Sequence, residues 1–331
     1  MAKKNMLQAV NEALVEEMER DPRVILIGED VEIGISGDTR NLVARGGPQR
    51  VRNTPICEST ITGLAVGAAA GGYRVVVHLM YANFIYTGFD AIANQMAKLR
   101  LMTGGQLNLP ITVLTVYGGG CSRGAQHSDS PHPLLMNLGG VNVLMPATPA
   151  DAKGLLKTAI RGDTPSFFFE MPGGSSGEVP EDDYTIPLGS ADVIQQGTDV
   201  TIVTIGSTRC AAVEAAERLA SQGVAAEIID IRSLVPLDRQ TVLRSISKTG
   251  RLVVVDEARQ RCSAASEIAA MVAELAFGAL KAPIRRVAVP NVSLPYAPNA
   301  EAPLLPTAER IVEAALAITS AQAERRHESN A

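Results

Sequence analysis

The chain has 331 residues, of which 46% are hydrophobic and 20% are charged. This composition is typical of a soluble globular protein, and the length exceeds that of one ordinary domain. The formal net charge is −5 and the basic residues are scattered, so we expect no nucleic-acid partner. No uncharged apolar stretch is long enough to span a bilayer, which argues against a membrane partner. The four cysteines are far apart and there is no signal peptide, so we expect reduced thiols and a cytoplasmic location.

The first half of the sequence predicts alternating helices and strands. Apolar residues at helical spacing from Met6 to Met18, followed by Asp21-Pro22 and the run VILIG, predict a helix and then a strand. Further strands are predicted at 74–79, 110–116, 141–146 and 166–170, and helices near 87–102 and at 149–161. Continuous apolar strands between helices are typical of a parallel sheet covered on both faces.

A segment rich in Gly, Pro, Ser and acidic residues, 171–189, is interpreted as a crossing between two domains. After it, strands are predicted at 199–206, 225–231, 251–258 and 284–290, with helices at 210–223, 237–250, around 268–275 and at 306–321. The expected fold class is therefore α/β, with two tandem doubly wound domains that contain mostly parallel sheets.

One charge, Glu58, stands in the small and apolar stretch TPICESTITGLAVGAAAGG at 54–72. The small residues after it predict a helix that packs closely against another element, such as another subunit, and that stops at Gly71-Gly72. A glutamate in a first turn commonly only complements the helix dipole. The alternative is a buried acid with a proton-transfer task. This stretch alone leaves both interpretations open.

The segment YGGGCSRGAQHSDSPHP at 117–133 follows a predicted strand and is the expected active-site loop, because loops at the carboxyl ends of parallel strands bind ligands. His127 lies among small polar residues there, which suits a general acid or base. His127, Asp129 and His132 are also considered as metal ligands, but their spacing matches no standard metal motif. His132 is interpreted as a structural histidine.

Four aromatic residues cluster at the end of the strand predicted at 74–79: Tyr81, Phe84, Tyr86 and Phe89. Such clusters usually belong to a core, although an aromatic ring beside a strand-end loop can stack on a heterocycle. The sequence contains no GxxxxGK[ST] motif and no G-x-G-x-x-G motif after the first strand. Independent nucleotide or phosphate binding is therefore not expected.

Nine ordered blocks give the chain, over essentially its whole length, a resemblance to the beta subunits of thiamine-diphosphate-dependent 2-oxoacid dehydrogenases, which include pyruvate, branched-chain and acetoin dehydrogenase components. The blocks are ILIGEDV, RVRNTPICESTITGLAVGAAAGG, ANFIYTGFDAIANQMAKLR, GAQHSDS, PATPADAKGLLKTAIR, DVTIVTIGS, EIIDIRSLVPLD, SISKTGRLVVVDEA and APNAE. The resemblance implies a transketolase-like pyrimidine-binding domain at 1–180. It also implies a transketolase C-terminal-like domain at 190–325 for assembly and partner docking.

The resemblance also implies roles for individual residues. In the family, the glutamate matching Glu58 hydrogen-bonds N1′ of the cofactor's aminopyrimidine and so activates the cofactor for attack on the substrate's 2-keto carbon. Phe84 matches the aromatic residue that stacks on the pyrimidine, and Ile56 and Met80 match its apolar or backbone neighbours. His127 matches a histidine that lines the active-site channel and assists later steps, including acyl transfer to a lipoyl group.

In the family, the GDG motif for magnesium and diphosphate lies on a separate alpha subunit, and this sequence contains no GDG. The resemblance therefore implies an alpha2-beta2 heterotetramer that shares thiamine diphosphate between chains and holds Mg²⁺ through the alpha subunit. The substrate would be a small 2-oxo acid, with a lipoyl acyltransferase core as a possible partner. The family's structural potassium lies around the segment matching AIRGDTP, where an acidic ligand position falls on Gly162, which argues against a potassium site here.

Two departures bear on the reaction itself. The usual HSQS reads HSDS at 127–130, and the usual histidine-proline-glycine is replaced at 137–140 by NLGG. Asp129 and Asn137 thus lie where substrate and acyl transfer are controlled. A transketolase-like carboligase that uses the same cofactor is therefore an alternative to the dehydrogenase. A non-catalytic assembly subunit is a second alternative.

Overall fold

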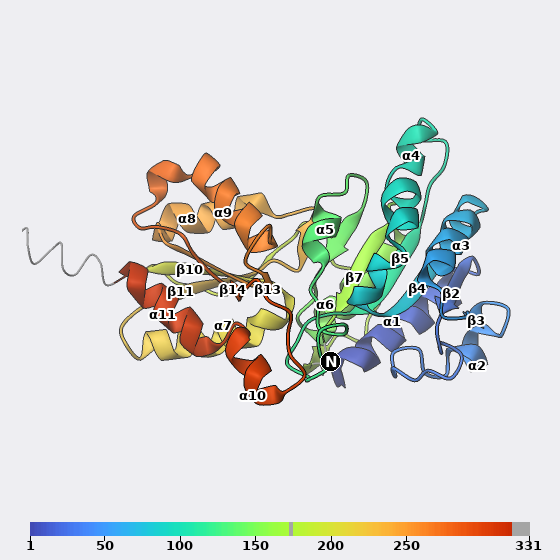
Figure 1. The fold of residues 1–331 in the computed structure, drawn as a ribbon, viewed down its shortest axis with the longest axis horizontal. Helices are drawn as coiled ribbons and strands as arrows, with labels where there is room; N and C mark the ends of the chain where they lie inside the picture. Colours follow the sequence, from blue (N-terminus) through green and yellow to red (C-terminus); the bar gives the residue numbers. More distant parts are fainter. Residues whose placement is uncertain (172–174, 320–331) are drawn as a thin grey trace, which may run out of the picture. The chain divides into compact units, whose positions relative to one another are not determined.

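The computed structural model describes residues 1–171 and 175–319, which form two compact units (Figure 1). The first unit contains 1–117, 126–188 and 233–236. The second contains 118–125, 189–232 and the described residues from 237 onward. Each unit is an α/β structure around a mostly parallel sheet, so the predicted fold class is confirmed.

The first unit is built on a seven-stranded sheet with the order β12-β6-β7-β5-β4-β2-β3. All neighbouring strands pair in parallel except β12, which is antiparallel to β6. The central strands are almost wholly buried, which explains their continuous apolar runs. The strands are β2 (Val24–Gly28), β3 (Val51–Asn53), β4 (Arg74–Tyr81), β5 (Ile111–Val116), β6 (Asn142–Leu144), β7 (Ser166–Glu170) and β12 (Ser233–Val235).

The helices of the first unit are α1 (Met6–Arg20), α2 (Leu42–Gly46), α3 (Glu58–Ala70), α4 (Leu99–Met102), α5 (His132–Met136) and α6 (Pro149–Arg161). Local signals fix two of their starts: Asn5 and Gln8 form a capping box before α1, and Thr148 caps α6. The helix predicted near 87–102 is present but interrupted: after a 3₁₀ turn at 82–86 come a π turn at 91–96 and the short α4.

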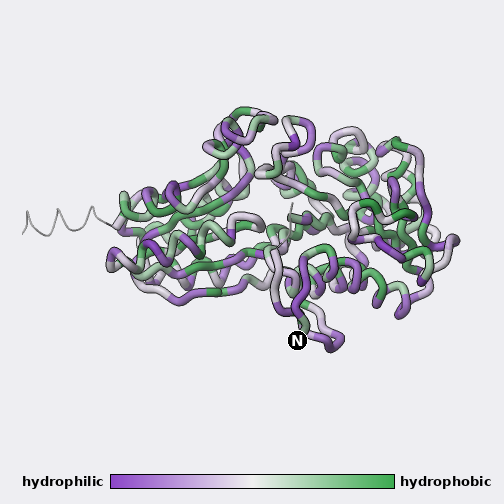
Figure 2. The backbone as a smooth tube through the Cα atoms, turned by 90° about the horizontal axis from the view of Figure 1, so that it is seen from below, coloured by the Kyte–Doolittle hydropathy of each residue, from purple (hydrophilic) through white to green (hydrophobic). Residues whose placement is uncertain are grey.

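The second unit has a five-stranded sheet with the order β14-β13-β10-β11-β9, in which only β9 is antiparallel to its neighbour. Figure 2 shows hydrophobic backbone segments inside this unit, in agreement with a buried cluster that includes Val200, Ile228 and Val253. The strands are β9 (Asp192–Gln195), β10 (Val200–Thr204), β11 (Ala226–Asp230), β13 (Leu252–Arg259) and β14 (Arg285–Val289). The helices are α7 (Arg209–Ala220), α8 (Arg239–Thr249), α9 (Ala264–Leu275), α10 (Pro298–Glu301) and α11 (Ala308–Thr319), with 3₁₀ turns at 206–208, 277–279 and 302–304.

The segment interpreted as a domain crossing contains an unexpected strand. β8 (Ser176–Val179) pairs antiparallel with the N-terminal strand β1 (Ala2–Asn5). Residues 172–174 of the predicted crossing lie outside the described residues. Within the described ranges, every helix is too short or too polar to cross a bilayer.

Candidate functional site

Glu58 is the first residue of α3, as the sequence predicts, and only 8% of it is exposed. Its carboxylate makes no hydrogen bond within the part of the chain that the structure describes. A carboxylate that only capped the helix would bond to backbone N–H groups of the first turn. The Glu58 oxygens are not among the fully buried polar atoms that lack a partner, so the carboxylate is accessible to a group from outside the chain.

A second carboxylate, Glu29, lies near Glu58 and was not singled out in the sequence. It follows β2 directly, and its buried Oε1 has no partner among the described residues. Burial raises the pKa of Glu29, and the negative charges of Glu58 and Asp30 raise it further. Its position in the sequence could have revealed it, because a carboxylate directly after an apolar parallel strand lies at the edge where α/β sheets bind ligands.

Phe84 and His127 come together although 43 positions separate them in the sequence. Their ring centroids lie 5.4 Å apart, edge to face. Tyr81 contacts both rings, at 5.9 Å from Phe84 and 4.6 Å from His127. Phe84 and His127 are each half-buried. The predicted active-site loop therefore places His127 beside Phe84, the predicted stacking ring. Tyr81 contacts both rings, although the sequence analysis named it only as one of four clustered aromatic residues.

The two remaining predicted cofactor neighbours lie in different environments. Met80 has a left-handed backbone with φ of +43°, which is unusual for a residue with a side chain. Ser36 Oγ lies 3.6 Å from its sulfur. Ile56 precedes α3 and is 81% exposed, so this large apolar side chain is open to a partner or ligand.

Three N–H groups of the loop, two of them from glycines, donate to carboxylates of the chain itself. The N–H of Gly119 donates to the carboxylate of Glu257, and that of Gly120 donates to Glu301 Oε1 at 3.0 Å. The Ser122 N–H donates to Glu301 Oε2 at 2.9 Å. Sequence reasoning missed both glutamates, since they lie more than 130 positions from the glycines with which they pair.

The metal-ligand interpretation of His127, Asp129 and His132 receives no support. His132 is buried in edge-to-face contact with Tyr117 and Phe169, in agreement with a structural histidine. The Asp129 N–H donates to Asn83 Oδ1, and Tyr86 donates its hydroxyl proton to Asp129 Oδ2 at 3.4 Å. Residues 1–171 and 175–319 contain no group of three or more His, Cys, Asp or Glu able to hold a metal ion.

Two strands of the seven-stranded sheet each carry a buried polar residue, His78 on β4 and Glu170 on β7. His78 Nε2 of β4 lies 2.9 Å from Asp38 Oδ2, and both residues are almost fully buried. Glu170, at the end of β7, is 1% exposed, and neither of its oxygens has a hydrogen-bond partner among the described residues. Burial, and then the negative charge of Asp38, raise the pKa of Glu170 well above its ordinary value.

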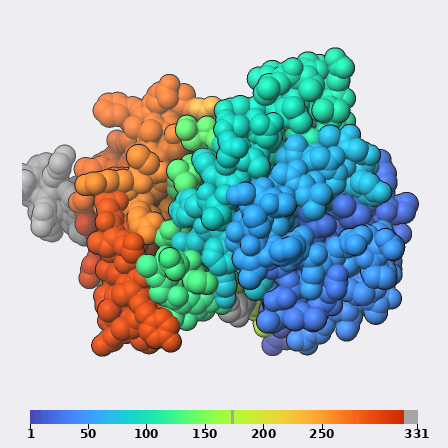
Figure 3. Space-filling view, turned by 45° about the vertical axis from the view of Figure 1, so that its right-hand side comes forward, coloured from blue at the N-terminus to red at the C-terminus, as the bar shows by residue number. Residues whose placement is uncertain are grey.

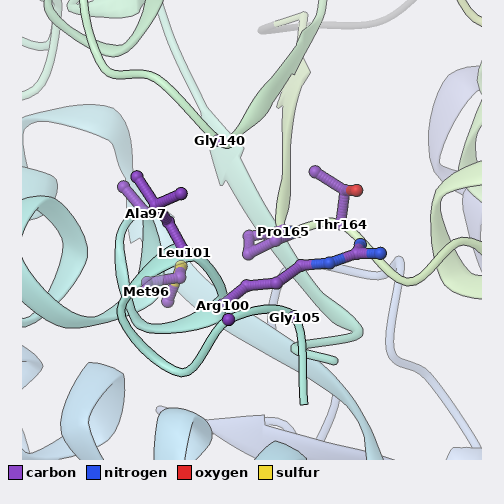
Figure 4. A pocket seen from close by; sticks show the side chains of 9 residues that line it. Met96, Ala97, Arg100, Leu101, Gly105, Gly140, Thr164 and Pro165 are labelled. Carbon is purple, nitrogen blue, oxygen red and sulfur yellow. The ribbon is translucent and has the colours of Figure 1, made fainter. Parts of the chain in front are cut away.

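A separate apolar cavity of about 320 Å³ lies away from these residues (Figure 4). Gly140 and Pro165 in its wall come just before β6 and β7, at the amino ends of strands, whereas His127 follows the carboxyl end of β5. The cavity is therefore not where Glu58 and His127 would meet a ligand. Its lining is completed by Met96, Ala97, Arg100, Leu101, Gly104, Gly105 and Thr164.

Comparisons with known proteins agree with this arrangement. Residues 2–172 match the model of the transketolase pyrimidine binding domain, and residues 189–311 match that of the transketolase C-terminal domain. A solved structure described as a split gene transketolase, inactive beta4 tetramer, superposes with a TM-score of 0.80 at 25% identity, and the match covers 96% of this chain and 98% of the other.

Relatives of similar length are more alike in sequence. The beta subunit of acetoin:2,6-dichlorophenolindophenol oxidoreductase from Bacillus subtilis (strain 168) is 44% identical, with 94% of this chain and 96% of the relative covered. The subunit of the same name from Cupriavidus necator is 45% identical, with 95% and 97% covered. The pyruvate dehydrogenase E1 component subunit beta of Bacillus subtilis (strain 168) is 38% identical, with 95% and 98% covered. The chain therefore belongs to the transketolase-like family of beta subunits of thiamine-diphosphate-dependent 2-oxoacid and acetoin dehydrogenases.

Proposed function

We propose that this chain is the catalytic beta subunit of an acetoin-type thiamine-diphosphate-dependent dehydrogenase, active only with an alpha subunit. Two of the acetoin relatives are 44% and 45% identical to it, compared with 38% for the pyruvate dehydrogenase subunit. The observation that carries the proposal is Glu58, a buried carboxylate at a helix start with no hydrogen-bond partner within the described ranges. Such a group suits the N1′ atom of an aminopyrimidine.

Four of the predicted site residues have tasks in this proposal. Glu58 would hydrogen-bond N1′ of the aminopyrimidine, and Phe84 and the exposed Ile56 would hold the pyrimidine ring. Bound thiamine diphosphate supplies a carbon nucleophile for the carbonyl carbon of the substrate. His127, held by the rings of Tyr81 and Phe84, transfers a proton in the later steps. Glu29 lies beside Glu58, and burial together with the negative charges of Glu58 and Asp30 raises the pKa of its carboxyl.

The surface of the first unit supports the need for a partner chain. Leu64 and Tyr73 on or beside α3 and Leu101 and Met102 on α4 are large apolar residues with 48% to 84% of their surface exposed. These helices lie at the surface of the blue-to-cyan part of Figure 3. Exposed apolar groups of this size typically mark protein interfaces. We assign this surface to the assembly with alpha subunits in an alpha2-beta2 enzyme.

The diphosphate and its Mg²⁺ would be held by the alpha subunit. In the loop that could offer backbone N–H groups to a phosphate, those of Gly119, Gly120 and Ser122 already donate to Glu257 and Glu301. The thiamine diphosphate site would then be shared between the two chains. The domain at 1–180 would contribute the pyrimidine side of that site, and the domain at 190–325 would serve assembly.

The potassium site of the family does not fit this chain. The backbone carbonyls of Ile160 and Gly162 accept hydrogen bonds from Arg74 Nη1 at 3.0 and 2.7 Å. Arg74 Nη2 also donates to Asp163 Oδ1 at 2.8 Å. A guanidinium therefore already binds two of the carbonyl oxygens of this segment, which supports the proposal that no potassium ion is held there.

The proposal is tested with Glu58→Gln in the enzyme assembled with its co-purified alpha chain. We expect turnover of acetoin in a dye-reduction assay to fall by about 10² to 10⁴, the usual contribution of a general acid or base. The matched control is Glu267→Gln, because Glu267 is also a first-turn glutamate but is exposed on α9. Equal activity of both variants would show that Glu58 only complements its helix.

The acceptor of the cleaved substrate is the second question. Asp129, which stands where the family has glutamine, accepts a hydrogen bond from Tyr86 beside the site, and the split transketolase shares the fold. Product analysis with and without a lipoyl domain identifies the acceptor. Reduced lipoyl product supports transfer to an acyltransferase core, whereas carbon–carbon ligation alone identifies a carboligase. Assembly without any turnover identifies a non-catalytic subunit.

A further inference from the structure

The 3₁₀ turn at 82–86, which follows β4, is anchored inside the first unit. Ile85 of the turn is fully buried. Directly after the turn, the backbone carbonyl of Thr87 accepts a hydrogen bond from Ser59 Oγ at 2.7 Å. Ser59 is the residue after Glu58 in the first turn of α3. The 3₁₀ turn is therefore joined to the helix start that carries Glu58.

The loop at 126–131 belongs to the same unit and forms neither helix nor strand. Its backbone therefore needs other partners. The Asp129 N–H donates to the side-chain carbonyl of Asn83 at 3.1 Å, and the Tyr86 hydroxyl donates to Asp129 Oδ2 at 3.4 Å. Both partners lie on the 3₁₀ turn. The turn thus holds the loop two residues after His127.

The rings on either side of Asn83 contact His127 itself. The imidazole centroid lies 4.6 Å from that of Tyr81 and 5.4 Å from that of Phe84, both edge to face. Such contacts restrict the imidazole ring, but they do not fix the backbone that carries it. A catalytic side chain must be held within about 0.5 Å of its productive position. The hydrogen bond from the loop backbone to Asn83 supplies the missing restraint.

We propose that Asn83 is a positioning residue: its side-chain carbonyl fixes the loop backbone at Asp129 and thereby holds the imidazole of His127 in place for its step in the reaction. The inference rests on the proposed function, in which His127 transfers a proton. Tyr86 supports the same loop through the Asp129 side chain. Because the turn is also joined to the start of α3, one element sets the positions of His127 and Glu58.

The first test measures the contact itself. Diethyl pyrocarbonate acylates imidazole nitrogens, so its rate of reaction reports the accessibility of His127 in the full-length chain. His78 and His132 are buried, and mass spectrometry assigns the label to each histidine. We expect Asn83→Ala to raise the labelling rate of His127 about fivefold, the change in an opening equilibrium that loss of one ordinary hydrogen bond produces. A wild-type labelling rate would overturn the inference.

The matched control is Asn291→Ala. The side-chain carbonyl of Asn291 also accepts a backbone N–H, that of Arg261 at 3.1 Å, but Asn291 is exposed and lies in the second unit. This variant should leave the labelling rate of His127 at the wild-type value. A rise equal to that of Asn83→Ala would show a general loosening of the chain, which contradicts the inference.

The second test asks whether Asn83 acts through His127, in the enzyme assembled with its alpha chain. We expect Asn83→Ala to lower kcat about fivefold with the KM for thiamine diphosphate unchanged, because Glu58 and Phe84 stay in place. In a His127→Asn background the same change should have no further effect, because residues that act as a unit are not additive. A raised KM for thiamine diphosphate with unchanged kcat would show that Asn83 acts on Phe84 instead, and would overturn the inference.

The outcomes separate this inference from the proposed function. If His127→Asn lowers kcat but Asn83→Ala costs as much in both backgrounds, the proposed function stands and the inference fails. If His127→Asn keeps wild-type kcat, the role proposed for His127 is wrong and the inference fails with it. Should Asn83→Ala not fold, Tyr86→Phe removes the second bond to the loop and takes its place in both tests, with results in the same direction expected.

Discussion

At the residue scale, Glu170 lies in an environment that is unfavourable for a charged carboxylate. It is buried, its oxygens lack partners within the described ranges, and its pKa is raised well above the ordinary value of about 4.5. A carboxyl with a higher pKa in the folded chain binds more protons when folded. The free energy of unfolding therefore falls as pH rises from about 4.5 towards the raised value.

We predict that Glu170→Gln removes this fall in the free energy of unfolding at high pH. At pH 5 the neutral acid and the amide should give similar stability. At pH 8 the variant should be more stable, by about 1.4 kcal/mol for each unit of the pKa shift. Thermal unfolding of both proteins at the two pH values measures the difference. Glu309→Gln should show no gain at pH 8, and a pH-independent difference for Glu170→Gln would contradict the prediction.

Arg74 allows a prediction about ions. Because its guanidinium bonds the carbonyls of Ile160 and Gly162, exchange of K⁺ for Na⁺ should leave both melting temperature and turnover unchanged. A resident ion at 100 times its dissociation constant would stabilise the fold by about 2.7 kcal/mol, which a melting experiment detects. A higher melting temperature in K⁺ alone would show that the ion has a site after all.

At the element scale, α3 contains two glycines that nothing within the described chain requires. Gly63 and Gly67 lie on an exposed face, and a Cβ at either would meet no atom within 4 Å. A glycine inside a helix costs about 1 kcal/mol relative to alanine. Close approach of another chain explains why they are present.

We therefore predict opposite effects of Gly63→Ala and Gly67→Ala on the free chain and on the assembly. Each should raise the stability of the chain alone by up to about 1 kcal/mol and weaken its association with the alpha subunit. Unfolding of the isolated chain and sedimentation of the mixed chains measure the two effects. The control is Gly223→Ala, at a turn with φ of +76°, which should destabilise the chain and leave association intact. Unchanged association of the α3 variants would exclude this face as an interface.

The elements that sequence predicted well are those with strong local signals. The strands at 24–28 and 166–170 and the helix at 149–161 have the predicted bounds, because continuous apolar runs and the Thr148-Pro149 start define them. The helix predicted near 87–102 is divided into a π turn at 91–96 and α4, a break for which residues 91–102 carry no Gly or Pro signal. The edge strands β1, β3, β8, β9 and β12 were missed because they are only three or four residues long.

The candidate site was partly visible in the sequence. The place of Glu58 at a helix start and the loop around His127 followed from local patterns. The contact of His127 with Phe84 and Tyr81 brings distant segments together, so only the family resemblance pointed to it. The pairing of the glycine run with Glu257 and Glu301 had no local signal at all, since a carboxylate far along the chain leaves no periodic trace.

At the scale of the whole molecule, the proposed function gives this chain one half of a cofactor site. We predict that calorimetry detects no binding of Mg²⁺ and thiamine diphosphate to the chain alone, because the sequence has no GDG motif and the N–H groups of Gly119, Gly120 and Ser122 already donate to carboxylates. Binding should appear when the alpha subunit is added. Tight binding to the beta chain by itself would place a diphosphate site on this chain.

The strand β12 has a consequence for synthesis on the ribosome. Residues 233–235 complete the edge of the first sheet beside β6, although most residues of the first unit lie before position 189. Domains commonly fold one after another as the chain emerges. Here the first sheet can close only after β9, β10 and β11 of the second unit have been made. The two units must therefore mature in overlapping time, and a nascent chain cut at the apparent domain boundary would leave β6 with an open edge.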